Sequence, residues 1–199
     1  MKLNAKELRE LEEKRAQGTI HEVKRQSLYF ILENIYDTYN IGGLFRLADA
    51  LAVEKMYLCG EIEIPPNTRI KKASIGTYKV VPWEYRKSAA DAIADLRETW
   101  NIKHKTSEQK ENKNTFHVSS FKFHVVAVEQ HLKAINYTKA SYQLPLALVF
   151  GNETAGVLPE TLKLVDQIVE IPMWGINKSL NVIVSAAIVS YWAVSKIKE

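Results

Sequence analysis

Residues 27–59 read SLYFILENIYDTYNIGGLFRLADALAVEKMYLC, and this stretch decides the fold class. The apolar run 27–33 predicts a buried strand, residues 42–51 predict a helix, and residues 53–59 predict a second strand. Two strands joined through a helix form a β-α-β unit, in which the strands run parallel. This opening therefore predicts an α/β fold with a mainly parallel sheet flanked by helices.

The remaining chain continues the alternation of strands and helices. We expect strands at 78–83, 121–128, 144–150 and 167–171, and helices at 88–100, 159–165 and 179–195. Ser88 is a suitable N-cap for the second helix, and Pro65, Pro66 and Asn67 predict a loop over residues 61–69.

The length of 199 residues fits one domain, which we expect to cover residues 27–199. Residues 1–26 are charge-dense and predict a short helical extension, with Leu3, Leu8 and Leu11 on its apolar side. Residues 101–115 are rich in Lys, Glu and Asn and predict a polar insertion on the surface. A hydrophobic content of 46% excludes a wholly disordered chain.

Composition favours a cytoplasmic protein with a polyanionic partner. The formal net charge is +4, a mild excess of positive charge. Cys59 is the only cysteine, which excludes an intrachain disulfide and a cysteine-cluster metal site and fits a reducing compartment. Residues 1–10 lack the apolar core of a secretory signal, and the apolar stretch 180–194 is shorter than the roughly 20 residues that span a bilayer.

The first candidate motif lies between the two opening strands. On a helix beginning near Gly42, the apolar residues form one stripe, and Arg46 points about 160° away from its centre, at 100° per residue. Asn40 is placed to cap this helix, so its N-terminus and the Arg46 guanidinium together suit a phosphate. The alternative is a surface pair between Arg46 and Asp49, with Asn40 as a plain cap.

The second motif is Gly151-Asn152-Glu153-Thr-Ala-Gly156, directly after a strongly apolar strand. Ligands of parallel sheets lie beyond the carboxyl ends of strands, where this loop is expected. The alternative is a solvated loop glutamate. The glycine spacing differs from Gly-x-Gly-x-x-Gly, which disfavours a nicotinamide-dependent oxidoreductase.

The third motif joins the last strand to the last helix. Ile171-Pro-Met173 ends the strand, and Ser179-Leu180-Asn181 opens a helix that is apolar nearly all round. Such a helix is expected to be buried by its own domain on one side and by a second subunit on the other. Ser179 and Asn181 are either site residues or simple N-caps.

Together the three segments resemble the motifs of the SpoU (TrmH-like) RNA 2′-O-ribose methyltransferases, within the SPOUT superfamily. The likeness rests on Asn-x-x-x-x-x-Arg, Gly-Asn-Glu-x-x-Gly, and Ile-Pro-Met followed by Ser-Leu-Asn-Val, in the family's order. It covers about residues 27–197. The resemblance implies an α/β domain whose C-terminal segment forms a deep trefoil knot. It also implies S-adenosylmethionine as cofactor, tRNA or rRNA as substrate, a homodimer, and no metal.

The resemblance also assigns site residues. The polar active-site positions of the family match Asn40, Arg46, Glu153, Ser179 and Asn181. The positions that bind the cofactor, largely through the backbone, match Gly151, Asn152, Ile171, Met173 and Leu180. A free arginine side chain has a pKa above about 12 and therefore stays protonated at neutral pH. Arg46 is thus expected to stabilise charge on the 2′ oxygen or a phosphate rather than to act as a base.

Two rival functions share this fold: an RNA-binding protein without catalysis, and a base N-methyltransferase. The RNA surface has two candidates. One interleaves cations with aromatic residues: Arg69, Lys71, Lys72, Lys79, Trp83, Tyr85, Arg86 and Lys87. The alternative for this segment is a solvated face with buried aromatic residues. The other is the N-terminal extension with Lys14, Arg15, Lys24 and Arg25.

Overall fold

The computed structural model describes residues 4, 6, 7, 23–108 and 122–198. Most of the expected N-terminal helix and residues 109–115 of the expected insertion lie outside these ranges. Within the described ranges, no helix has the length and apolar character needed to cross a membrane.

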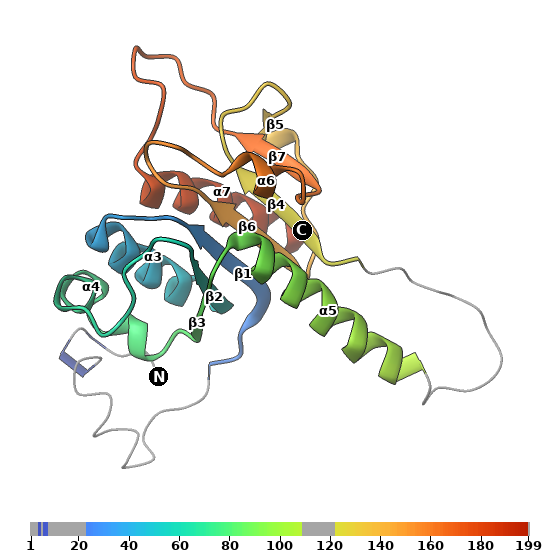
Figure 1. Cartoon of the computed structure of the whole chain (residues 1–199), viewed down its shortest axis with the longest axis horizontal. Coiled ribbons are helices and arrows are strands. Elements are labelled where there is room, and N and C mark those ends of the chain that lie inside the picture. Colours follow the sequence, from blue (N-terminus) through green and yellow to red (C-terminus); the bar gives the residue numbers. More distant parts are fainter. Residues whose placement is uncertain (1–3, 5, 8–22, 109–121, 199) are drawn as a thin grey trace.

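The centre of the molecule is a seven-stranded sheet in the order β3-β2-β1-β6-β4-β7-β5, and all of its paired strands run parallel (Figure 1). The strands are β1 Gln26–Glu33, β2 Val53–Cys59, β3 Trp83–Arg86, β4 His124–Val128, β5 Ile135–Asn136, β6 Leu146–Phe150 and β7 Gln167–Glu170. This arrangement confirms the predicted α/β class with a parallel sheet. Strand β5, of two residues, was not predicted.

Helices cover both faces of the sheet (Figure 1). They are α3 Thr38–Ala50, α4 Thr68–Ser74, α5 Ala89–Glu108, α6 Pro159–Leu162 and α7 Val182–Lys198. Helices α3 and α7 share one apolar core with Leu28, Phe30 and Leu32 of β1. Helix α5 packs on the other face with Ile31. Burial on both faces explains why β1 is a continuous apolar run rather than an alternating one.

Helix α3 begins four residues earlier than predicted. Asp37, not Asn40, is its N-cap, and the Asp37 Oδ1 accepts a hydrogen bond from the Tyr39 N–H at 2.8 Å. Both residue types are good N-caps, so the sequence does not discriminate between them. The earlier start places Asn40 inside the first turn, where its side chain is free to face other segments.

The strand predicted at 78–83 is wrong for most of its length. Thr77–Lys79 form a 3₁₀ turn, and strand β3 starts only at Trp83. The turn is stabilised by local hydrogen bonds, from the Thr77 hydroxyl to the Ser74 carbonyl at 2.8 Å and from the Lys79 N–H to the Gly76 carbonyl at 3.0 Å. Local bonds of this kind compete with strand pairing.

Further boundaries differ. Helix α5 continues through residues 101–108, so the first half of the expected surface insertion is helical. Its N-terminus is as predicted, because the Ser88 Oγ accepts a hydrogen bond from the Asp91 N–H at 3.1 Å. Helix α7 starts at Val182, three residues after the predicted start at Ser179. Helix α4, whose N-cap is Asn67, replaces the end of the expected loop.

Candidate active site

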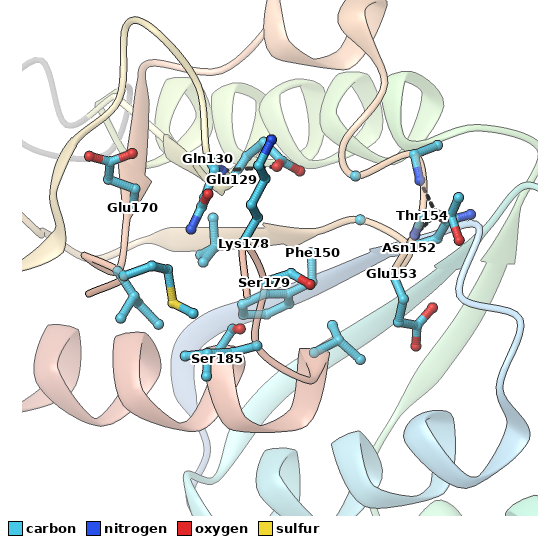
Figure 2. A pocket seen from close by; sticks show the side chains of 18 residues that line it. Glu129, Gln130, Phe150, Asn152, Glu153, Thr154, Glu170, Lys178, Ser179 and Ser185 are labelled. Carbon is cyan, nitrogen blue, oxygen red and sulfur yellow. Dashed lines mark hydrogen bonds between the residues drawn. The ribbon is translucent and has the colours of Figure 1, made fainter. Parts of the chain in front are cut away.

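A cavity of about 360 Å³ lies at the carboxyl edge of the sheet. It is bounded by residues that follow β4, β6 and β7 and by the segment that leads into α7. In Figure 2, Glu153 and Glu170 lie at opposite ends of this cavity, with Ser179 between them. Ligands of parallel sheets bind at this edge, so the cavity is the candidate site.

The loop after β6 is a compact turn organised by Asn152. The Asn152 Oδ1 accepts hydrogen bonds from the backbone N–H groups of Thr154 at 2.8 Å and Ala155 at 2.6 Å. The backbone carbonyl of Asn152 accepts from the Gly156 N–H at 3.0 Å. The residue is buried. Its side chain therefore fixes the loop, a role that the family resemblance did not indicate.

Two carboxylates hold the end of this loop through consecutive backbone N–H groups. Glu129 Oε2 accepts from the Val157 N–H at 2.8 Å, and Glu33 Oε2 accepts from the Leu158 N–H at 2.8 Å. Burial raises the pKa of the Glu33 carboxyl, and hydrogen bonds from Thr161 and Leu158 act in the opposite direction. Sequence reasoning missed both residues, although each is an acidic residue at the end of an apolar strand.

Three segments that are distant in sequence meet beside the cavity. The Asn40 Nδ2 donates a hydrogen bond to Glu153 Oε1, and the Asn181 Nδ2 donates to Asn40 Oδ1 at 3.0 Å. Asn181 also caps α7, because its Oδ1 accepts from the Ile183 N–H at 2.9 Å. The geometry thus joins one residue from each predicted motif. Asn181 is an N-cap, and its role as a site residue stays a prediction.

Consecutive glycines place helix α3 between two other helices. A Cβ on Gly42 would clash with Ala73 of α4, and a Cβ on Gly43 would clash with Ile183 of α7. Both neighbours therefore approach α3 closely, and at Gly42 the approach also involves the α4 backbone at Ser74 and Ile70, which a side chain would obstruct. The contact with α7 brings Asn40 within reach of Asn181.

The two remaining polar residues are placed differently. Ser179 lines the cavity, and its backbone N–H contacts the Asn177 Oδ1 at 3.4 Å. Arg46 is exposed on α3, as predicted from the helical stripe, and does not line the cavity. Among the described residues Arg46 forms no ion pair, so the alternative of an Arg46–Asp49 surface pair does not hold.

The five residues expected to bind a cofactor all line the cavity: Gly151, Asn152, Ile171, Met173 and Leu180. Its charged lining residues are Glu129, Glu153, Glu170 and Lys178. This lining suits a ligand that carries positive charge and also has one anionic group.

Comparison with known proteins identifies the family. The model of the "SpoU rRNA Methylase family" matches residues 27–191. The chain belongs to the SpoU rRNA methylase family. Two relatives are named tRNA (guanosine(18)-2′-O)-methyltransferase. The Aquifex aeolicus protein is 27% identical, over 94% of this chain and 74% of its own length. The Escherichia coli protein is 24% identical, over 85% of this chain and 64% of its own length.

Solved methyltransferase structures share the fold. The methyltransferase AviRb from Streptomyces viridochromogenes in complex with AdoMet has a TM-score of 0.69 at 23% identity, over 87% of this chain and 62% of that chain. The AdoMet-bound rRNA methyltransferase from Sinorhizobium meliloti has a TM-score of 0.69 at 24% identity, over 88% and 58%. The chain thus spans less than two thirds of the length of several relatives that it matches.

In this SpoU family member, the residues of the first candidate RNA surface differ in their contacts: some are engaged within the protein and others are exposed. The Arg86 guanidinium contacts the carboxylates of Glu84 and Asp95, and Trp83 packs edge-on against Phe45 in the core. Arg69, Lys71 and Lys72 are exposed on α4. Arg86 and Trp83 are thus engaged within the protein, and the exposed cations on α4, which packs against α3, stay a candidate RNA surface.

In the second candidate RNA surface, one of the two described cations is likewise engaged within the protein. The Arg25 guanidinium donates hydrogen bonds to the carbonyls of Val53 at 2.9 Å and Val80 at 2.6 Å, so Arg25 joins β2 to the turn before β3. Lys24 is exposed, and Lys14 and Arg15 lie outside the described residues.

Proposed function

We propose that this protein is an S-adenosylmethionine-dependent methyltransferase that modifies a ribose 2′-hydroxyl of tRNA or rRNA. The observation that carries the proposal is the hydrogen-bonded group of Asn40, Glu153 and Asn181 beside the cavity. Family membership and the RNA 2′-O-methyltransferase names of its relatives support the same reaction.

The cavity fits the cofactor in size and chemistry. Its volume of about 360 Å³ falls within the range of small-molecule sites. Gly151, Ile171 and Leu180 would hold the cofactor through backbone groups, and the carboxylates of Glu129 and Glu170 suit its cationic groups, while Lys178 suits its carboxylate. When bound, S-adenosylmethionine supplies an electrophilic methyl group on a positively charged sulfur.

The polar residues of the chain would position the acceptor ribose. Asn40 is buried, and its amide already bridges Glu153 and Asn181, so these three side chains hold one another in a fixed geometry. Fixed donors and acceptors lower the cost of aligning a nucleophile. Ser179 adds a hydroxyl at the cavity wall. Arg46 would bind a phosphate or stabilise negative charge that develops on the 2′ oxygen.

The protein would act as a homodimer. Leu180, Val184 and Tyr191 keep 36%, 46% and 53% of their surface exposed on or just before α7. Large apolar side chains grouped on one helix are typical of a subunit interface. A sedimentation experiment on the wild type and on Tyr191→Glu tests this: we expect a dimer and a monomer, respectively. A monomeric wild type at micromolar concentration would contradict the dimer.

We further propose that residues 27–199 form the catalytic domain and that its C-terminal segment is knotted as a deep trefoil. Family membership supports both statements. Residues 1–26 and the polar insertion at about 101–115 would then be additions to this domain, and the protein would work in the cytoplasm.

One assay tests the function. The protein is incubated with labelled S-adenosylmethionine and, separately, with total tRNA and with rRNA, and the products are digested to nucleosides. We expect the label in a 2′-O-methyl nucleoside. Label in a methylated base would favour the base N-methyltransferase. RNA binding without any incorporation would favour the protein without catalysis.

A further inference from the structure

Helix α3 has one exposed strip on its surface. Its exposed residues are Tyr39, Arg46 and Ala50, and Gly43, which lies between Tyr39 and Arg46, is partly exposed. At 100° per residue, Tyr39 and Arg46 are about 20° apart around the helix, and they are about 10 Å apart along its axis. Both side chains therefore point the same way. Of these four residues, only Arg46 has a role in the proposed function.

This strip lies between the two helices that flank α3, which are α4 and α7 (Figure 1). Gly42 contacts α4 and Gly43 contacts α7. At 100° per residue, Tyr39 and Arg46 both fall between these two glycines around the helix axis. The strip is thus the side of α3 that neither neighbour covers. The neighbouring helix α4 carries three exposed cations, Arg69, Lys71 and Lys72.

Tyr39 is at the end of α3 nearest the proposed methyl-transfer site. Helix α3 follows β1 and so begins at the carboxyl edge of the sheet, where the first cavity also lies. The next residue, Asn40, forms the hydrogen bonds to Glu153 and Asn181. Its side chain lies about 100° from that of Tyr39, on an adjoining side of the same helical turn. An RNA strand that reaches from a ribose at Asn40 to a phosphate at Arg46 would therefore run along the strip, with Tyr39 at its ribose end.

The Tyr39 side chain is available for a contact outside the chain. It is 50% exposed, and within the described part of the protein neither its ring nor its hydroxyl has a hydrogen bond or an aromatic contact. Its backbone N–H donates to Asp37 Oδ1, so the N-cap of α3 does not depend on the Tyr39 side chain. An exposed aromatic face on the same strip as a guanidinium suits single-stranded nucleic acid, which binds through stacking and charge.

We propose that Tyr39 positions the acceptor RNA by stacking on a base close to the methylated ribose. This proposal rests on the methyltransferase function proposed above. Every base has a face that can stack, so Tyr39 would hold the strand in place without selecting one nucleoside. A second copy of the chain is the alternative partner for an exposed aromatic ring. The cations of Arg46 and α4 favour the anionic RNA strand.

The first test measures kcat and KM for RNA in Tyr39→Ala and Tyr39→Phe, with Leu164→Ala as a control. Leu164 is 37% exposed and follows α6, whose Leu162 packs in the core on the α5 side of the sheet. Loss of one stacked base should raise the KM of Tyr39→Ala about tenfold. The affinity for S-adenosylmethionine should be unchanged, because Tyr39 does not line the first cavity. Tyr39→Phe keeps the ring and should match the wild type.

Several results of this test would overturn the proposal. An unchanged KM in Tyr39→Ala removes Tyr39 from RNA binding, and an equal rise in Leu164→Ala shows that the effect is not specific. An equal rise in Tyr39→Phe assigns the effect to the hydroxyl rather than to the ring face. A change from dimer to monomer in Tyr39→Ala, measured by sedimentation, assigns the ring to a contact between two copies of the chain.

The second test locates the stacked base on a transcript that carries the mapped methylation site. Abasic nucleotides are placed, one per transcript, at the methylated position and at the two positions on either side. One of these transcripts should raise the KM of the wild type about tenfold and that of Tyr39→Ala hardly at all, because both changes remove the same contact. A constant ratio between the two proteins on every transcript overturns the stacking. A wild type that makes no 2′-O-methyl product from intact RNA instead overturns the methyltransferase function.

Discussion

Asn40 and Glu153 are 113 residues apart in the chain, yet the Asn40 amide donates a hydrogen bond directly to the Glu153 carboxylate. Asn181, from a third segment, donates to the same Asn40 side chain. The Asn40 amide therefore has an assigned orientation, with its nitrogen toward the carboxylate and its oxygen toward α7. This fixed orientation makes the group sensitive to small chemical changes.

Replacing Asn40 by Asp should be more damaging than its similar shape suggests. The change removes the donor to Glu153 and places two carboxylates in contact. We expect a loss of about 1–3 kcal/mol in the free energy of unfolding, together with a large loss of methyl transfer. Urea denaturation measures the first and the labelled-methyl assay the second. Thr99→Ser, at an exposed position on α5, serves as the control. Unchanged stability in Asn40→Asp would show that the Asn40–Glu153 bond contributes little.

Arg46 is predicted to act on the RNA and not on the cofactor, because it is exposed on α3 and does not line the first cavity. Arg46→Ala should reduce turnover by about 100-fold or more. Calorimetry should give an S-adenosylmethionine affinity close to that of the wild type. Arg46→Lys, which keeps the charge but loses the planar fork, should recover only part of the activity. Wild-type turnover in Arg46→Ala would remove Arg46 from the chemistry.

Glu129 is predicted to position the cofactor loop through the Val157 N–H. In Glu129→Ala this buried end of the loop loses its acceptor, and the dissociation constant for S-adenosylmethionine should rise about tenfold. Glu129→Gln keeps an acceptor oxygen for the Val157 N–H and should restore most of the affinity. Equal losses in both variants would instead indicate that the negative charge of Glu129 is what the cofactor requires.

His124 should make the protein less stable in mild acid. Burial lowers the pKa of this side chain from its ordinary value of 6.5, with Lys122 acting in the same direction and Asp166 in the opposite one. Below pH 6.5 the unfolded chain binds a proton that the folded protein excludes, so the free energy of unfolding falls as the pH falls toward the folded pKa. The slope from this one group is at most about 1.4 kcal/mol per pH unit.

Urea denaturation at pH 7.5 and pH 5.5 measures this effect. His124→Leu should flatten the pH dependence, whereas His131→Asn, at an exposed histidine, should leave it unchanged. Identical pH dependence in the wild type and His124→Leu would show that His124 is not the group responsible.

Much of the fold could be predicted from the sequence, because the central strands are buried on both faces and therefore stand out as apolar runs. Val53–Cys59 was predicted with its true bounds, and the start of α5 was predicted from Ser88. The turn at Thr77–Lys79 was missed because its apolar neighbours resemble a strand, and only local hydrogen bonds distinguish the two.

The residues of the site could be predicted from the sequence better than the hydrogen bonds between them. Motif positions indicated Asn40, Glu153 and Asn181, but no local pattern reveals which side chain donates to which across more than 100 residues. Glu33 and Glu129 were missed for the same reason. Each is a single acidic residue after a strand, and its role depends on the backbone of a loop that is distant in sequence.

The position of α3 between α4 and α7, set by Gly42 and Gly43, has a consequence for how such enzymes diverge. One side of this helix meets α4, and the other meets the segment that we assign to the methyl donor. Residues on the α4 side of this helix can therefore vary while the proposed transfer machinery on the other side is inherited unchanged.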